Sequence, residues 1–146
     1  MTLLIRPYEP ADLEPLSAIW FEASRRAHGF LGEARLREQH KLIEEVYLPQ
    51  AENWVALRSD EPVGFIGLID DFIGGLFVDP SAQGRGIGRA LVARALRLKG
   101  RLELEVYAQN ASARGFYERL GFQEILRREL NDEGLPFPNL RMRLEA

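Results

Sequence analysis

The 146-residue sequence contains no cysteine and only two histidines. A chain without cysteine has no disulfide bond, no thiolate nucleophile and no sulfur-ligated metal site. His28 and His40 form no His-Glu-x-x-His pattern, so the sequence predicts no metal site. No segment approaches the ~20 apolar residues of a membrane span, and the apolar run before Arg6 is too short for a signal peptide. We therefore expect a cytoplasmic protein that does not bind a membrane.

A strong excess of one charge is also lacking, because the net charge is −3 with 28% charged residues. This balance gives no general argument for a nucleic-acid partner, and basic and aromatic residues do not alternate along one strand as in many RNA-binding domains. The 46% apolar content is ordinary for a globular protein, and the length fits one domain over residues 1–146.

The segment 74–91 organises the rest of the chain. A β-prone run, Leu76 to Val78, ends at Asp79 and Pro80, where proline removes a ladder donor. Three alternating glycines follow, and apolar residues then recur at helical spacing. The pattern predicts a strand, a turn, a glycine loop and a helix. The glycines are 84, 86 and 88, and the apolar positions are Ile87, Leu91, Ala95 and Leu98.

A glycine loop at a helix N-terminus favours an anion. About four backbone N–H groups lack intrahelical partners there, and glycine lets a phosphate approach them closely. Arg85 and Arg89 could add charge-assisted hydrogen bonds. A dinucleotide motif would need glycine at position 89 or 91, where arginine and leucine stand. No Gly-Lys pair occurs, which excludes a nucleoside-triphosphate loop.

A second informative stretch covers residues 110–122. Asn110 is a favourable N-cap and Gly121 a favourable residue just beyond a helix end. Phe116 and Leu120 share the face that we expect to be buried. Gly115 within the helix costs about 1 kcal/mol relative to alanine, which predicts that another group approaches it closely.

Together, Gln83-x-x-Gly86-x-Gly88 and the Asn-x-x-Ala-x-x-Phe-Tyr-x-x-x-Gly-Phe sequence that starts at Asn110 resemble two motifs of the GNAT superfamily of N-acetyltransferases. The chain resembles its small single-domain bacterial members. The resemblance implies an α/β GNAT fold: a mixed, mostly antiparallel twisted sheet of six to seven strands, flanked by about four helices. In that fold a central parallel pair, here near residues 74–78 and 102–106, is splayed at the cofactor site.

The same resemblance implies transfer of an acetyl group from acetyl-CoA to a primary amine by direct attack through a tetrahedral intermediate. A backbone N–H near Phe77 or Val78 would hold the thioester oxygen, and Tyr117 would protonate the thiolate leaving group. Tyr117 could instead be a packed phenol, and Asn110 a plain helix cap. The implied cofactor-binding residues are Leu76, Phe77, Val78, Gln83, Gly84, Arg85, Gly86, Ile87, Gly88, Arg89, Asn110 and Tyr117.

The amine must lose a proton before it attacks, because a lysine-like amine has a pKa near 10.4. We name His28 as the first candidate base, and Asp70, Asp71 and Glu105 lie on or beside the expected central strands. His40 reads as a solvated helix residue. Glu103 and Glu105 alternate with apolar residues, which indicates a solvated strand face.

The acceptor stays open between a small molecule and a peptide or protein amine, and the oligomeric state between monomer and homodimer. The main alternative to an enzyme is a domain that binds acyl-CoA without transferring the acyl group, as a sensor or a partner-recruiting element.

Outside the two motifs, hydrophobic periodicity predicts the remaining elements. Helices are expected from Asp12 to about Arg26 and over residues 36–47. Expected strands cover residues 3–6, 54–57, 63–69, 102–106, 123–129 and 139–144, and the second and third form a hairpin.

Overall fold

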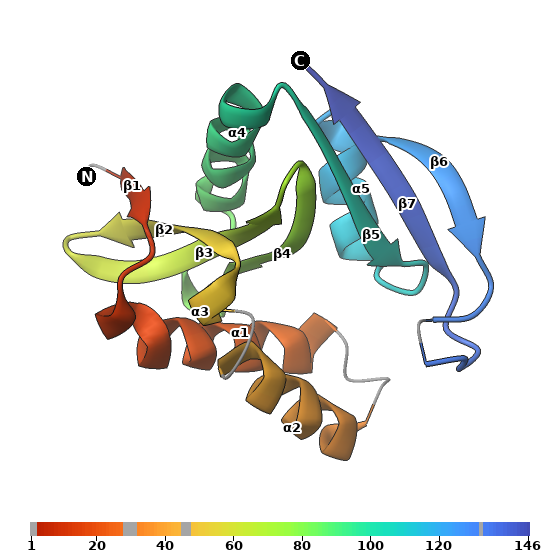
Figure 1. Cartoon of the computed structure of the whole chain (residues 1–146), viewed down its shortest axis with the longest axis horizontal. Helices are drawn as coiled ribbons and strands as arrows, with labels where there is room; N and C mark the ends of the chain where they lie inside the picture. The colour runs from red at the N-terminus through yellow and green to blue at the C-terminus, as the bar shows by residue number, and fades with distance from the viewer. Residues whose placement is uncertain (1–2, 28–31, 45–47, 132) are drawn as a thin grey trace.

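The computed structural model describes residues 3–27, 32–44, 48–131 and 133–146. The fold is α/β, with one seven-stranded sheet in the order β1-β2-β3-β4-β5-β7-β6 (Figure 1). The strands are β1 (Leu3–Pro7), β2 (Glu52–Arg58), β3 (Glu61–Ile69), β4 (Phe72–Val78), β5 (Arg101–Tyr107), β6 (Gln123–Arg128) and β7 (Asn139–Glu145). The helices are α1 (Leu13–Ala27), α2 (Glu33–Leu42), the single-turn α3 (Leu48–Gln50), α4 (Ile87–Lys99) and α5 (Ala111–Arg119).

The sheet is mixed and mostly antiparallel. Among the strands of the described residues, only β4 and β5 run parallel, joined by the crossover helix α4, and the other neighbours are antiparallel. A strand-helix-strand crossover produces parallel neighbours, as segment 74–106 predicts. The expected sheet of six to seven strands, its central parallel pair and the four helices of more than one turn are confirmed.

Two apolar cores lie on opposite faces of the first half of the sheet. Leu16 and Trp20 of α1 pack with Val55 and Phe65 on one face. On the other face α4 packs on alternate residues of the same strands, such as Ile66. The second core continues along β5 and β7 to α5 (Figure 1). Successive side chains of a strand point to opposite faces of the sheet, so strands with a core on each face bury both sets of side chains.

The second half of the sheet has one apolar and one charged face. Leu102, Leu104 and Val106 of β5 lie in the core, while Glu103 and Glu105 point to the other face. The expected solvated face is wrong at Glu103, which is only 7% exposed. It is buried because arginines from β7 cover and neutralise it.

Two further expectations about helices change. Leu98 follows the helical spacing but is exposed on α4, whose buried residues are instead Ile87, Leu91, Val92 and Ala95. The helix expected over residues 36–47 starts earlier, at Glu33, and residues 45–47 lie outside the described part of the chain. Among the helices of the described residues, none has the length and apolar character needed to cross a membrane.

Candidate functional site

The parallel strands β4 and β5 separate after two residue pairs. Phe72 pairs with Glu103 and Ile73 with Leu104, and the described ladder between the two strands ends there. At the same point the register with β3 shifts, so that Gly74 is an extra residue on β4. A bulge bends its strand and leaves the extra residue unpaired. The rest of β4 therefore turns away from β5 and leaves backbone groups facing the opening.

The glycine loop lies just beyond the end of β4 and leads into α4. Gly84 and Gly86 have φ values of +80° and +78°, in the left-handed region that favours glycine. A Cβ at either position would meet no atom within 4 Å, so open space surrounds this backbone. α4 begins at Ile87 and runs for 13 residues. Its first N–H groups therefore lie at an open, positively polarised end.

A cavity of about 1090 Å³ connects the strand opening with the glycine loop. Gly74 and Gly75 of β4 and Leu104 to Tyr107 of β5 line it. Arg85 alone among the twelve predicted cofactor residues does not line it and points to solvent. The other eleven do: Leu76, Phe77, Val78, Gln83, Gly84, Gly86, Ile87, Gly88, Arg89, Asn110 and Tyr117.

Tyr117 reaches the cavity from α5. The Asn110 side chain caps this helix by accepting a hydrogen bond of 3.1 Å from the Ala113 N–H, as the sequence predicts. Tyr117 is 8% exposed and makes edge-to-face contacts with Phe116 and Phe122, with ring centroids 5.1 and 5.3 Å away. Burial raises the pKa of the Tyr117 phenol above its usual value, so the hydroxyl keeps its proton at neutral pH.

A close approach occurs at Gly115, as expected, and also at Gly88. A Cβ at Gly115 would lie 3.1 Å from the flexible end of the Arg119 side chain, and a Cβ at Gly88 would lie 3.1 Å from the Phe116 ring. Gly88 therefore lets α5 pack against the first turn of α4. This contact brings Tyr117 and the glycine loop to the same cavity.

Side chains from distant segments form the opposite wall of the cavity. In the segment after β6, the Asn131 side chain holds the backbone in place. Its Oδ1 accepts hydrogen bonds from the N–H groups of Glu133 and Leu135, each at 3.0 Å. Glu133 also forms an ion pair with Arg35 of α2. Hydrophobic periodicity does not predict this wall. The turn-forming residues after β6 are a local sequence feature that points to it. Its residues include Trp20, Ala23, Ser24, Gln39, Arg128, Asn131, Glu133 and Asn139.

The structure separates the carboxylates considered as bases. Glu105 lines the cavity and forms an ion pair with Arg128 of β6 at 3.0 Å. Asp70 lies in a turn with φ of 54°, Asp71 pairs with Arg101, and neither lines the cavity. Glu105 is therefore the carboxylate of this set that can face an incoming substrate.

The two histidines have different outcomes. His28, the first candidate base, lies outside the described residues. The expectation that His40 is a solvated helix residue is wrong. Its ring stacks on Trp20 with centroids 5.6 Å apart, and its Nε2 lies 2.6 Å from the Ser17 hydroxyl. Periodicity in α2 alone could not show this contact with α1. Within the described ranges, no three His, Asp or Glu side chains are grouped to hold a metal ion.

Comparisons with known proteins converge on one family. A family model described as an acetyltransferase (GNAT) domain matches residues 22–145. The chain is 40% identical to peptidyl-lysine N-acetyltransferase YjaB of Salmonella typhimurium over 143 residues, which cover 97% of this chain and 98% of that protein.

Solved structures agree with this relationship. The solution structure of the apo form of YjaB from Escherichia coli matches all of both chains with a TM-score of 0.90 and 37% identity. The PaiA N-acetyltransferase of Thermoplasma acidophilum, solved in complex with coenzyme A, matches all of both chains with a TM-score of 0.79. At 18% identity this second likeness concerns the fold alone.

Proposed function

The chain belongs to the GNAT family of acetyltransferases, and we propose that it transfers the acetyl group of acetyl-CoA to lysine side chains of proteins. One observation carries the proposal. A single cavity joins the open edge of β4, the bare glycine loop and Tyr117 to the carboxylate of Glu105. Binding, protonation and deprotonation groups for acyl transfer therefore face one space.

The residues present fit coenzyme A. Its diphosphate matches the left-handed glycines 84 and 86 and the first N–H groups of α4, since such ends favour phosphate. Its extended pantetheine carries amides, which can pair with the backbone groups that β4 leaves open after Ile73. When bound, acetyl-CoA supplies an activated acyl group as a thioester.

We assign the general-acid role to Tyr117, which lines the cavity from α5. Its phenol is neutral at physiological pH and can donate its proton to a thiolate within reach. The aromatic contacts with Phe116 and Phe122 fix the ring, which limits the conformations of the hydroxyl.

The opposite wall suits a cationic amine. Glu133 of that wall and Glu105 of β5 both line the cavity, and each also forms an ion pair with an arginine. A carboxylate there attracts an ammonium group and can accept its proton directly or through water. The two YjaB relatives, 40% and 38% identical to this chain, are named peptidyl-lysine N-acetyltransferases. The names of these relatives favour a lysine side chain over other amines.

The test measures coenzyme A release and acetyl-lysine formation with N-terminally blocked peptides that contain one lysine. We expect turnover with the lysine peptide and none with a matched peptide that carries arginine instead. Mass spectrometry locates the acetyl group. Turnover only with an unblocked peptide N-terminus would contradict the lysine assignment while keeping the transferase.

The alternative is a domain that binds acyl-CoA without transfer. It predicts measurable coenzyme A binding together with zero turnover across an amine panel. His28 remains a candidate base in addition to Glu105. Comparison of His28→Gln with Glu105→Gln assigns the proton acceptor. The variant with the larger loss of kcat at neutral pH identifies it.

A further inference from the structure

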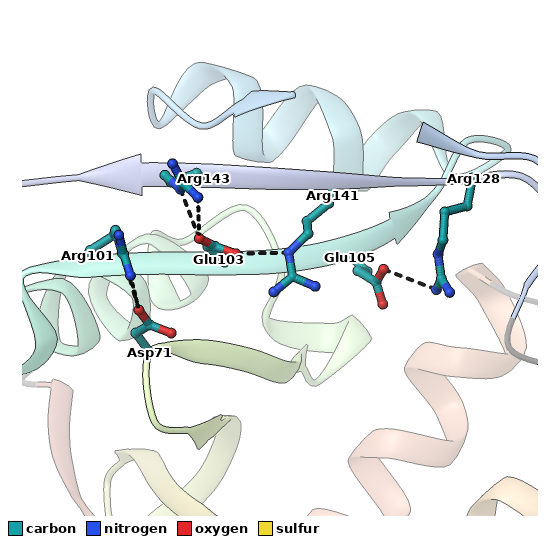
Figure 2. A network of polar contacts seen from close by, with 7 residues as sticks. All are labelled: Asp71, Arg101, Glu103, Glu105, Arg128, Arg141 and Arg143. Atoms are coloured by element: carbon teal, nitrogen blue, oxygen red, sulfur yellow. Dashed lines mark hydrogen bonds and ion pairs between the residues drawn. The ribbon is translucent and has the colours of Figure 1, made fainter. Parts of the chain in front are cut away.

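A buried carboxylate lies at the closed end of the opening between β4 and β5. The Glu103 Oε1 accepts a hydrogen bond of 2.8 Å from the Arg141 Nε, and its Oε2 accepts one of 2.8 Å from the Arg143 Nε. Figure 2 shows Glu103 between these two arginines of β7, with Glu105 further along β5 and paired with Arg128 of β6. The cluster of Glu103, Arg141 and Arg143 therefore joins β5 to β7 through side chains as well as through the ladder.

The same cluster reaches β4. The Arg141 guanidinium lies over the ring of Phe72, with 5.1 Å between its central carbon and the ring centroid. Phe72 is the residue of β4 that pairs with Glu103, and the Glu103 N–H donates to the Asp71 carbonyl at 3.0 Å. Three strands are thus linked at the first of the two paired positions, one residue before the last pair ahead of the opening.

The ladder alone holds β5 much more firmly to β7 than to β4. Every residue of β5 from Arg101 to Tyr107 has a partner on β7, whereas only Glu103 and Leu104 have partners on β4. The angle between β4 and β5 is therefore poorly fixed by backbone hydrogen bonds. A planar arginine stacked on Phe72 and hydrogen-bonded to Glu103 supplies a rigid contact at this point.

We propose that Glu103 acts through Arg141 and Phe72 as a positioning residue that sets the width of the strand opening for pantetheine. This inference rests on the proposed function, because it assumes that coenzyme A occupies the opening. It predicts that the cluster affects binding of the pantetheine arm and leaves binding of the nucleotide at the glycine loop unchanged.

Charge explains why the carboxylate is needed. Hydrogen bonds from Arg141 and then Arg143 outweigh burial and hold the pKa of Glu103 below its usual value, so it is ionised at neutral pH. Without this charge the two arginines repel each other. Arg141 faces Glu105 in the β5–β7 register, so a released Arg141 has a carboxylate beside the cavity to turn to. The stack on Phe72 would then be lost.

The experiment compares two ligands by calorimetry: coenzyme A and its nucleotide fragment, 3′-phospho-ADP, which lacks pantetheine. We expect Glu103→Gln to weaken coenzyme A binding about tenfold, since small misplacements at a positioned ligand have effects of this size or larger. Binding of the fragment should change less than about twofold. Glu52→Gln is the matched control, because Glu52 also accepts a hydrogen bond from a cation, Lys99, but lies on β2.

Arg141→Lys provides a second variant that keeps the charge and loses the planar stack. It should weaken coenzyme A binding about threefold, again without affecting the fragment. An equal change for both ligands in the folded variants, or no change in either, overturns the inference and leaves the proposed function intact. Failure of the unaltered protein to bind coenzyme A overturns both. Should Glu103→Gln fail to fold, Arg141→Lys decides the result.

Discussion

The two walls of the cavity are built in different ways. One wall, which we call the cofactor wall because we propose that coenzyme A binds there, comes mainly from residues 72–89. It presents backbone groups of β4 and of the glycine loop. The opposite wall comes from α1, α2 and the segment after β6, and it presents side chains such as Gln39 and Glu133. We call it the acceptor wall, because we propose that the amine binds there. A wall of backbone depends on local conformation, whereas a wall of side chains depends on tertiary packing. Substitutions should therefore act differently on the two sides.

The largest expected effect comes from Tyr117, which lines the cavity from α5. Tyr117→Phe removes the proton donor and keeps the ring contacts with Phe116 and Phe122. We expect kcat to fall about a hundredfold or more, because general acids contribute at least that much. The Kd for acetyl-CoA should change little. Tyr8→Phe is the control, because Tyr8 does not line the cavity. An unchanged kcat would remove Tyr117 from the chemistry.

A smaller loss is expected at Glu105 of β5, the proposed proton acceptor. Glu105→Gln should lower kcat/KM for a lysine peptide about tenfold to a hundredfold at pH 7, without weakening acetyl-CoA binding. The free amine has a pKa near 10.4, so its neutral fraction rises with pH and the variant should recover activity toward pH 9. A pH profile with coenzyme A release as the signal checks this. A constant deficit across the range would contradict a role in deprotonation.

Two glycines at opposite ends of α4 form a matched pair, of which Gly86 lies on the cofactor wall and Gly100 does not line the cavity. Gly86 and Gly100 have φ values of +78° and +79°, and a Cβ at either would meet open space. Alanine at either position should cost about 1–2 kcal/mol of folding free energy, from backbone strain alone. Only Gly86→Ala should weaken coenzyme A binding, by about fivefold to tenfold. Thermal melts and calorimetry on both variants separate strain from binding.

The smallest effect is expected from the ion pair between Arg35 and Glu133 on the acceptor wall. Arg35→Gln removes the ion pair with Glu133, and exposed pairs contribute about 0–1 kcal/mol. The KM for a lysine peptide should therefore change by no more than about fivefold, and added salt should reduce the difference. Arg25→Gln breaks a comparable pair on α1 and serves as the control. A change in the Kd for acetyl-CoA would show that the two walls are coupled.

The cofactor wall was the predictable part of this molecule. Strand, turn, glycine loop and helix follow from steric and periodic rules that act over a few residues, and the cap at Asn110 follows likewise. The bulge at Gly74 also has a local signal, since glycine within a strand pattern marks such a site.

The acceptor wall could not be predicted in this way. Glu133 lies 98 positions from Arg35, and no local rule joins them. Glu103 was assigned to a solvated face because alternation shows only that a strand has two unlike faces. It cannot show that β7 brings two arginines to cover the acid. The same limit explains His40, whose packing depends on the position of α1.

The opening between β4 and β5 is, in effect, a strand edge in the middle of a sheet. Exposed edges at the rim of a fold invite strands of other molecules and promote aggregation. This edge instead borders an internal cavity, with α1 and α5 contributing to its walls. A strand that belongs to the sheet of another protein cannot enter this cavity, whereas a single extended chain can. The protein can therefore keep unused hydrogen-bonding groups permanently ready without offering them to its neighbours.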